Sequence, residues 1–351
     1  MNAKTTSKKA IKKLESSYYD RCQRLKALQI LNQLEINSSR KLDRSTKGLC
    51  DEYAVEVLGD RKYRYWLYVY SQMGDGFKSG WIPENYYVNH VVKKLKGLPG
   101  QMSGLRSLHR VIFGSDAFPD LGSYVNGLFF DENGSHVSQD KVSSMLFRGR
   151  SRVIYKCEES GKGQGIHFFT KSNFRIGEIE SLGNGVFQSI VTQHPELAIY
   201  STSSVSTLRI TTVSTDLGEV SARSSTYKVA SAGATNVNSS NSVRTAVDIH
   251  SGMFAWPAYR RDWSLAPRAD FGNGDPAGKI FPHFVEARDL VLKLHQKVPY
   301  VRCIGWDLVV DADGKVQIFE WNGFGNAIVF GEATQGPCFA DLGWEKLWKI
   351  K

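Results

Sequence analysis

The chain has 351 residues, of which 41% are hydrophobic and 12% aromatic, and its formal net charge is +10. This length predicts two packed lobes, and no apolar run approaches the roughly 20 residues that cross a bilayer. The five cysteines are scattered without a CxxC pair, and the first residues lack the apolar stretch of a secretory signal. We therefore expect reduced thiols in a cytoplasmic protein, rather than a disulfide framework or a zinc site.

The first part of the chain is strongly basic. Residues 1–50 carry 12 Lys or Arg against 4 Asp or Glu, which places +8 of the net charge there. Residues 7–36 are predicted to form a helix whose apolar stripe packs on the body of the protein; the stripe is Ala27, Leu28, Leu31 and Leu34. The charge favours peripheral contact with an anionic membrane or a lipid-linked sugar, and the alternative is a solvated helix without a partner. No motif for specific nucleic-acid recognition accompanies the charge.

Further along, helices give way to strands. Residues 50–72 are predicted to form one helix, and a second helix runs from the Pro83-Glu84 entry to Lys96. Residues 97–123 have no clear assignment. Strands are predicted at 124–130, 152–157, 166–170, 204–213, 220–229, 303–310 and 315–321, with helices near 138–147 and 281–297. The pattern predicts an α+β protein with a helix-rich basic region over residues 1–110 and a catalytic region over residues 111–351.

A hairpin is predicted over residues 301–323. Asp313-Gly314 lies between two runs of β-forming residues, which is a strong signal for a two-residue turn. Such a turn pairs Ala312 with Lys315, and this register determines which residues face one another further along the two strands.

Three potential metal ligands share one face of this hairpin. The register pairs Asp307 with Glu320, and Asn322 lies two residues beyond Glu320 on the same side. Facing carboxylates repel each other, and a magnesium ion that takes carboxylate and amide oxygens offsets that repulsion. The alternative is a solvent-facing acidic pair that is screened by water or lysine.

A glycine-rich segment follows the strand that ends with Lys156. Gly161, Lys162, Gly163 and Gly165 lie between this strand and the next. Glycines allow the backbone to approach phosphate oxygens closely, and Lys162 adds positive charge. The segment lacks the GK[ST] of a Walker A loop, and a strand follows it rather than a helix. A hairpin turn without function is the alternative.

Polar residues on the later strands complete the candidate site. Arg209 lies within a predicted strand, where it would clamp a phosphate or carboxylate or form a surface ion pair. Arg223 on the next strand has the same two interpretations. Asn236 lies in a Ser/Asn/Gly loop that either approaches phosphate and metal or simply turns.

Taken in order, these segments resemble the ATP-grasp fold, in which two α+β subdomains enclose ATP. More narrowly, the chain resembles the sugar-transfer-associated ATP-grasp family over roughly residues 80–345. The stretches that carry the resemblance are IPENYY (82–87), YVNGLFFDENG (124–134), SIVTQHPELA (189–198), SSVSTLRITT (203–212), IGWDLVV (304–310) and IFEWNG (318–323). The chain departs from the family pattern at Ser206, where the family usually has Asn, and at Ser239-Ser240, where it usually has Gly-Gly.

The resemblance implies a role for each candidate residue. Lys156 would contact the α and β phosphates, and residues 161–165 would close over the β and γ phosphates. The hinge that meets adenine would be Gln188, Ser189, Ile190 and Val191. The catalytic residues would be Arg209, Lys162 and Arg223, with Arg209 on the transferred phosphate. Magnesium would be held by Asp307, Glu320 and Asn322, with assistance from Asn236.

The resemblance also implies an activity with ATP and Mg²⁺ as cofactors. The expected enzyme is a carboxylate–amine ligase that makes an amide through an acyl phosphate, on a sugar acid of a cell-surface polysaccharide. One alternative is a kinase that phosphorylates a sugar hydroxyl with the same residues. Another is a non-catalytic nucleotide-binding or scaffold module that docks through its basic N-terminal segment.

Overall fold

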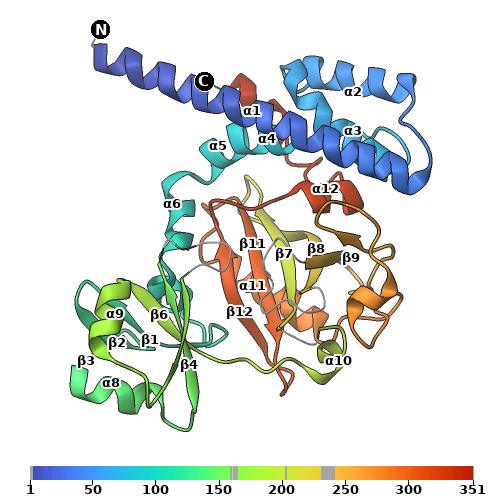
Figure 1. The fold of residues 1–351 in the computed structure, drawn as a ribbon. Helices are drawn as coiled ribbons and strands as arrows, with labels where there is room; N and C mark the ends of the chain where they lie inside the picture. Colours follow the sequence, from blue (N-terminus) through green and yellow to red (C-terminus); the bar gives the residue numbers. More distant parts are fainter. Residues whose placement is uncertain (1–2, 159, 161–164, 202–203, 231–241, 351) are drawn as a thin grey trace. The chain divides into compact units, whose positions relative to one another are not determined.

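The computed structural model describes residues 3–158, 160, 165–201, 204–230 and 242–350. Its backbone divides into two compact units (Figure 1). Unit 1 comprises Met1–Gly97, Asp262–Ala266 and Ala327–Lys351, and unit 2 comprises Leu98–Arg261 and Pro267–Asn326. This division differs from the expected one at residue 110, because the last part of the chain packs with the helices of unit 1.

Unit 1 is helical. Its first helix, α1 (Ala3–Ser38), buries Ala27, Ile30, Leu31 and Leu34, whereas Leu28 of the predicted stripe remains exposed. The single helix predicted over 50–72 is wrong. The chain forms α2 (Arg44–Glu56), a short 3-10 helix η1 (Arg61–Tyr63) and α3 (Arg64–Met73). The break falls at Gly59, whose φ of 82° and close approach to Trp348 exclude a side chain.

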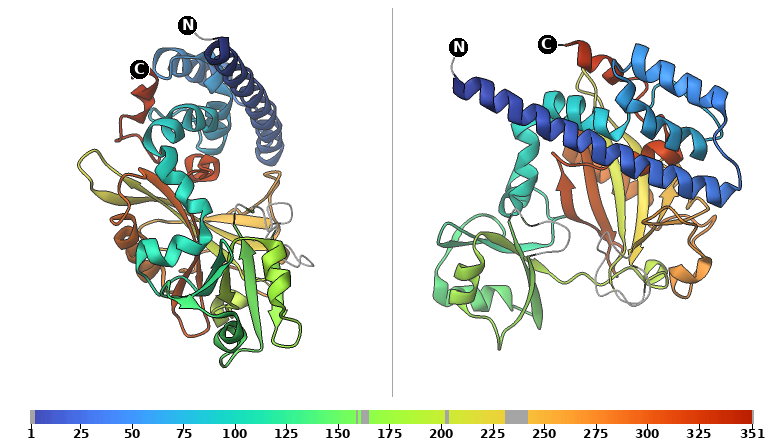
Figure 2. Two further views of the ribbon diagram at one scale, coloured as in Figure 1. Left: turned by 90° about the vertical axis from the view of Figure 1, so that its left-hand side faces the viewer. Right: turned by 45° about the horizontal axis from the view of Figure 1, so that its top comes forward.

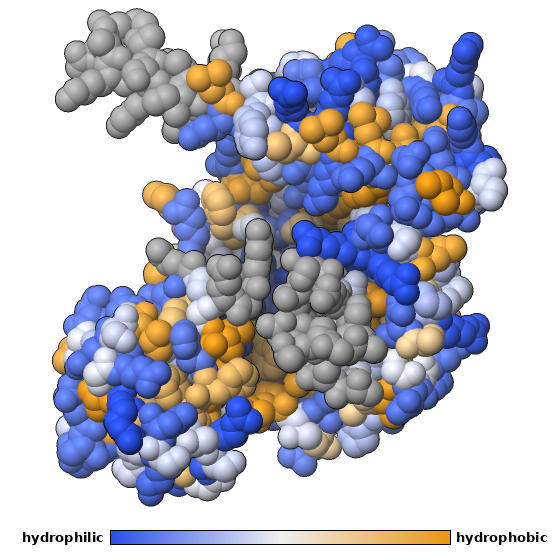
Figure 3. Space-filling model, in the orientation of Figure 1, coloured by the Kyte–Doolittle hydropathy of each residue, from blue (hydrophilic) through white to orange (hydrophobic). Residues whose placement is uncertain are grey.

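The second predicted helix is present in three parts. They are α4 (Glu84–Tyr86), a π-helical segment η2 (Tyr87–Val92) and α5 (Lys93–Leu95). The C-terminal helices α12 (Val329–Gln335) and η6 (Trp344–Lys349) pack with them, since Trp81 Nε1 donates to the Glu332 carbonyl at 3.0 Å and Tyr86 Oη donates to the Trp344 carbonyl at 2.9 Å. The space-filling view shows apolar side chains among the hydrophilic ones of this unit (Figure 3).

Unit 2 begins with short helices and a first antiparallel sheet. The helices are α6 (Gly97–Gln101), η3 (Met102–Gly104), η4 (Arg106–Leu108) and α7 (His109–Phe113), and they occupy the segment that sequence reasoning left unassigned. The strand order is β3-β2-β1-β6-β4-β5. The strands are β1 (Asp120–Val125), β2 (Leu128–Asp131), β3 (His136–Val137), β4 (Arg152–Cys157), β5 (Ile166–Thr170) and β6 (Gly185–Ser189).

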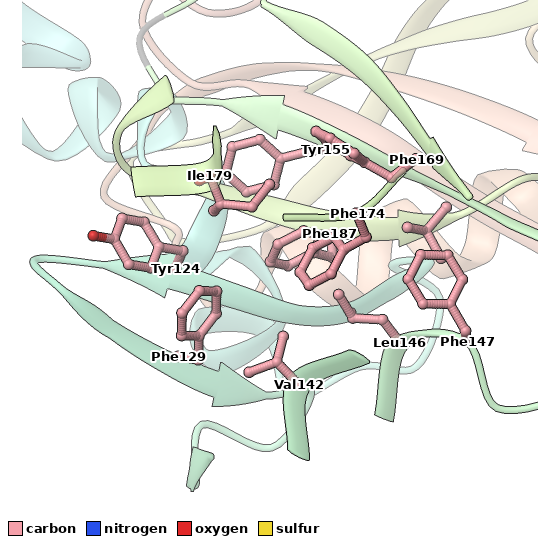
Figure 4. Close-up of a cluster of buried hydrophobic side chains, with 11 residues drawn as sticks. Tyr124, Phe129, Val142, Leu146, Phe147, Tyr155, Phe169, Phe174, Ile179 and Phe187 are labelled. Carbon is pink, nitrogen blue, oxygen red and sulfur yellow. The ribbon is translucent and has the colours of Figure 1, made fainter. Parts of the chain in front are cut away.

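One face of this sheet is buried under two helices, α8 (Gln139–Leu146) and α9 (Ile176–Leu182). Figure 4 shows the aromatic cluster between them, in which Tyr155 of β4 and Phe187 of β6 lie with ring centroids 4.6 Å apart. Because side chains alternate along a strand, the neighbours of these residues face the opposite side. Lys156 and Gln188 are therefore placed on the face that the helices leave uncovered.

The second sheet of unit 2 is also antiparallel, with the order β10-β9-β8-β7-β11-β12. Its strands are β7 (Thr207–Ser214), β8 (Val220–Ala230), β9 (Ser242–Val247), β10 (Tyr259–Arg260), β11 (Cys303–Val310) and β12 (Val316–Asn322). A short helix α10 (Pro195–Ala198) precedes it, and η5 (Arg268–Phe271) follows β10. Two antiparallel sheets with packed helices confirm the expected α+β class.

Helix α11 (Phe284–His295) covers one face of the second sheet (Figures 1 and 2). Thr212 lies on the face of the sheet that α11 covers, because its hydroxyl lies 2.7 Å from His295 Nδ1 and 2.9 Å from Trp306 Nε1. Asp307, the next residue after Trp306, consequently faces away from α11.

The turn between β11 and β12 is longer than the predicted two-residue turn. Asp311 N donates to Lys315 O at 3.0 Å, so three residues rather than two form the loop, and Gly314 at its end has a φ of 81°. The loop shifts the register by one residue, and Leu308 pairs with Ile318. A β-bulge at Phe319 then shifts it back, so that Asp307 pairs with Glu320 as predicted.

Candidate functional site

A row of charged side chains crosses the uncovered face of the second sheet. Strand pairing places Arg209 of β7 beside Asp307 of β11, and Asp307 beside Glu320 of β12. Arg209 Nε donates to Asp307 Oδ1 at 2.6 Å, and its Nη2 donates to Oδ2, so the contact is bidentate. The two side chains are only 15% and 17% exposed. Burial acts to raise the pKa of Asp307, but Arg209 and Lys228 outweigh it and hold that pKa below its usual value.

Glu320 and Asn322 are the third and fourth polar groups of the row, and Glu320 is the more open acid. The Glu320 side chain is 40% exposed, with Arg106 Nη2 at 3.9 Å from its Oε1. Asn322 Nδ2 donates to the Gly305 carbonyl at 3.2 Å and reaches Asp307 Oδ2 at 3.5 Å. Asn322 thus lies beside Asp307, and its amide oxygen is not used in these contacts.

This donor set suits magnesium, since it offers two carboxylates and an amide oxygen. The structure changes the argument for a metal, however. We expected a dication to offset repulsion between the carboxylates, and Arg209 already does so at Asp307. Within the described ranges, no three His, Cys, Asp or Glu side chains gather as a metal cluster. The assignment of magnesium to Asp307, Glu320 and Asn322 therefore stays a prediction that rests on donor chemistry.

Lys156 approaches the row from the first sheet. Its ammonium lies 4.9 Å from the ring centroid of Phe319, the extra residue of the bulge in β12. Burial lowers the pKa of Lys156 to about 8 and Arg106 adds to the effect, whereas Glu320 opposes it. The bulge thus has two consequences: it restores the Asp307–Glu320 pairing, and it presents Phe319 to Lys156.

Two cations on this face were missed by sequence reasoning. Lys228 of β8 pairs with Arg244 of β9, two residues along the strand from the row of Arg209. The Arg209 charge and then burial lower the pKa of Lys228 to about 8, and burial lowers that of Arg244 to about 10. The alternation of side chains along β8 indicates which face Lys228 takes, but the sequence contains no signal for the register of β8 against β7.

The predicted hinge lies at the end of β6. Gln188 is buried, and its Nε2 donates at 2.7 Å to Asp120 Oδ1, whose pKa burial raises to about 6. Ser189 N donates to the Pro119 carbonyl at 2.9 Å, Ile190 is exposed and Val191 is buried. Ser189 and Asp120 border a hollow of about 760 Å³, within the size range of small-molecule sites. The contact of these residues with adenine stays a prediction.

The remaining candidates are only partly visible. Gly161, Lys162, Gly163 and Asn236 lie outside the described residues. Gly165 closes the base of the glycine-rich segment, because Cys157 N donates to its carbonyl at 2.9 Å and a Cβ there would lie 2.7 Å from the Cβ of Ser160. Arg223 is the extra residue of a bulge in β8, opposite the step between Thr211 and Thr212.

Residues 176–337 match the family described as sugar-transfer associated ATP-grasp. The resemblance expected from the sequence is confirmed over this segment. The matched segment contains Arg209, Lys228, Asp307, Glu320 and Asn322, whereas Lys156 lies before it. No curated protein matches the chain in sequence.

Several solved structures are similar to this chain at low identity. The biotin carboxylase domain of Hydrogenobacter thermophilus 2-oxoglutarate carboxylase is 11% identical, with a TM-score of 0.45 over 72% of this chain and 46% of that one. The ATP-grasp ligase PsnB is 12% identical, with a TM-score of 0.41 over 73% and 62%. The Coxiella burnetii D-alanine–D-alanine ligase is 11% identical, with a TM-score of 0.40 over 71% and 59%. This chain thus spans about half to three fifths of the length of these proteins.

The helices that the structure describes include none with the length and apolarity required to cross a bilayer.

Proposed function

We propose that the chain is an ATP- and magnesium-dependent ligase that joins a carboxylate to an amine. The observation that carries the proposal is the row of Arg209, Asp307 and Glu320 on one sheet, with Lys156 from the other sheet against Phe319. Carboxylates that would hold a metal and cations that would bind phosphate thus lie together in unit 2. Of these residues, all but Lys156 belong to the segment that matches an ATP-grasp family.

Each group has a role that its surroundings suit. Asp307, Glu320 and Asn322 would hold magnesium, which neutralises charge on the transferred phosphoryl group. Lys156 and Lys228 would bind phosphate oxygens, because two half-buried lysines are stabilised when an anion enters their site. Arg209 keeps Asp307 ionised and is close enough to the carboxylates to meet the transferred phosphate.

The proposed reaction has two steps. A carboxylate oxygen of the acceptor attacks the γ-phosphorus of ATP, and the bond from that phosphorus to the β–γ bridging oxygen breaks. ADP departs, and the acceptor is left as an acyl phosphate. The amine nitrogen then attacks the acyl carbon, inorganic phosphate departs with the electrons of the C–O bond, and the nitrogen gives a proton to water. Cations that neutralise the phosphoryl oxygens favour both steps.

In this proposal the carboxylate belongs to a sugar acid of a cell-surface polysaccharide, and the description of the matched family names an association with sugar transfer. Contact between α1 and an anionic membrane or a lipid-linked sugar is part of the proposal. Leu14 and Tyr18, the apolar residues that follow the lysine-rich start of α1, are 70% and 72% exposed. Exposed apolar residues beside a basic run are typical of helices that bind the membrane interface.

The test is ADP release with a panel of uronic acids and of amines or amino acids, with magnesium and with EDTA, followed by mass spectrometry of the products. We expect ADP, inorganic phosphate and an amide, all dependent on magnesium. A phosphorylated sugar in place of the amide would show the kinase. A chain that binds ADP but forms no ADP from ATP with any pair of acid and amine would be a non-catalytic module. Either result would overturn the proposal.

A further inference from the structure

Arg106 lies in η4, ahead of the first sheet, and contacts the end of the Lys156 strand. Its Nη1 donates to the Cys157 carbonyl at 2.8 Å and to Ser160 Oγ at 3.3 Å. Its Nη2 donates to the Ser160 carbonyl at 2.6 Å. One guanidinium therefore binds two residues, Cys157 and Ser160, that precede the glycine-rich segment.

The next residue strengthens this attachment. Ser107 N donates to Glu158 Oε1 at 3.3 Å, and the Ser107 hydroxyl donates to the same oxygen. Glu158 N in turn donates to the Asn184 carbonyl at 2.8 Å, just before β6. The η4 segment thus holds the end of β4 through Cys157, Glu158 and Ser160.

Arg106 also faces the carboxylate row on the other sheet. Its Nη2 lies 3.9 Å from Glu320 Oε1, and its side chain is only 13% exposed. The same Nη2 has a second N–H besides the one it gives to Ser160, because a guanidinium carries five donors in a fixed plane. Arg106 lies close enough to Lys156 to lower the pKa of that lysine, so the two cations share one electrostatic environment.

We propose that Arg106 is a positioning residue that ties the base of the glycine-rich segment to Glu320. Building on the function proposed above, it fixes the distance between the chain at Cys157 and Ser160 and the Glu320 carboxylate before nucleotide arrives. At 3.9 Å from Glu320 Oε1, Nη2 is beyond hydrogen-bond distance of that carboxylate, so its second N–H can donate to a phosphate oxygen. Nucleotide affinity therefore depends on Arg106, although the residue belongs to neither sheet.

The test compares Arg106→Gln and Arg106→Lys with Arg110→Gln. Arg110 is the matched control, because it follows one helical turn later and its Nη1 donates to the Phe118 carbonyl at 3.5 Å rather than to the end of β4. ADP binding is measured calorimetrically in magnesium, and amide hydrogen exchange over residues 152–160 is measured on the ligand-free chain. We expect Arg106→Gln to weaken ADP binding about tenfold or more, as loss of charge-assisted bonds does, and to accelerate exchange at the end of β4.

Arg106→Lys keeps the charge but not the planar fork, so it should restore part of the affinity and little of the exchange protection. Arg110→Gln should change neither. Affinity and exchange both within twofold of wild type in folded Arg106→Gln would overturn the proposal, as would equal losses in Arg110→Gln. If the wild-type chain binds no ADP, the proposed function fails, while exchange on the ligand-free chain still decides whether Arg106 holds the strand end.

Discussion

Asp307 in unit 2 and Glu332 in unit 1 are both largely buried acids, but Asp307 is ionised whereas Glu332 is neutral. Glu332 is fully buried, and burial raises the pKa of its carboxyl well above the usual value, against hydrogen bonds from the Cys338 and Ile82 backbones. Asp307 has Arg209 in bidentate contact and Lys228 nearby, and its pKa is lowered. Burial alone neutralises a carboxyl group, whereas burial beside cations keeps it charged.

The comparison separates structural acids from functional ones. The neutral carboxyl of Glu332 is packed among the helices of unit 1. An ionised carboxylate that is retained beside Arg209, as Asp307 is, has the charge that a metal ion would require.

The largest effect is expected from Asp307→Asn. It leaves Arg209 half-buried without its acid, so we expect a loss of about 3 kcal/mol in the free energy of unfolding of unit 2. ATP turnover should fall on the order of 10²- to 10³-fold. Denaturant unfolding and ADP release measure the two effects.

Glu320→Gln is the matched control, because Glu320 is more exposed than Asp307 and its Oε1 lies 3.9 Å from Arg106 Nη2. It should lose turnover to a similar extent and change stability by less than about 0.5 kcal/mol. Equal stability of the two variants would show that the Arg209 contact does not hold Asp307 in place, and normal turnover in Glu320→Gln would refute the metal assignment.

Raising the pH should weaken nucleotide binding. Lys156 and Lys228 both have a pKa of about 8, below the usual lysine value, so they are charged at pH 7 and lose the proton as the pH rises through 8. Between pH 7 and pH 9 the charged fraction of each falls about tenfold, and ADP affinity should fall with it. Calorimetric titration across this range measures the slope.

Lys156→Arg keeps its charge at pH 9, so it should remove the share of the slope that Lys156 contributes and leave that of Lys228. An affinity that is flat with pH in wild type, or a Lys156→Arg slope equal to the wild-type slope, would contradict the assignment of these lysines to the phosphate site.

A smaller effect is expected in unit 1 from Glu332→Gln. The folded pKa of Glu332 is raised, and so is that of Glu84, to about 7, largely through burial. The folded state therefore binds more protons than the unfolded state above the ordinary carboxyl pKa, and the stability these groups provide at low pH is lost as the pH rises. Wild type should lose more than about 1.4 kcal/mol, the value of one pKa unit, between pH 5 and pH 8.

In Glu332→Gln that loss should be reduced, because the amide has no proton to release. The readout is the free energy of unfolding at the two pH values. Identical pH profiles for wild type and variant would mean that Glu332 is ionised in the folded protein, and the contrast with Asp307 would fail.

The smallest effect concerns charge outside both sites. Residues 1–15 contain five lysines and one acid, Glu15. Their deletion should weaken binding to anionic vesicles at low salt by at least about fivefold, the effect of roughly 1 kcal/mol. Co-sedimentation with vesicles of anionic and of neutral lipid measures it. Unchanged binding would identify the segment as a solvated helix.

Sequence reasoning finds the Asp307–Glu320 pair although it predicts the wrong turn. The Asp-Gly signal is local, but it does not distinguish a two-residue from a three-residue loop, and the bulge at Phe319 cancels the error. Without the bulge, the one-residue shift would place Phe319 opposite Asp307 and turn Glu320 to the other face. The single helix predicted over 50–72 fails at Gly59, where packing against Trp348 overrides helix propensity.

Arg106, Lys228 and Arg244 are not found, because their positions depend on contacts between distant segments. Arg106 meets Cys157 only when η4 docks on the end of β4. Lys228 joins the site through the register of β8 against β7, which has its own bulge near Thr211. Such registers are set by the packing of the whole sheet, and local sequence contains little information about them.

The most direct test of the account is calorimetric titration of ADP into the wild-type chain and into Glu320→Gln, each with magnesium and with EDTA. Glu332→Gln serves as the control for a buried acid outside the site. The account predicts that magnesium strengthens ADP binding about tenfold or more in wild type and in Glu332→Gln, and has little effect in Glu320→Gln. Equal ADP affinity with magnesium and with EDTA in the wild-type chain, or an undiminished magnesium effect in Glu320→Gln, would contradict it.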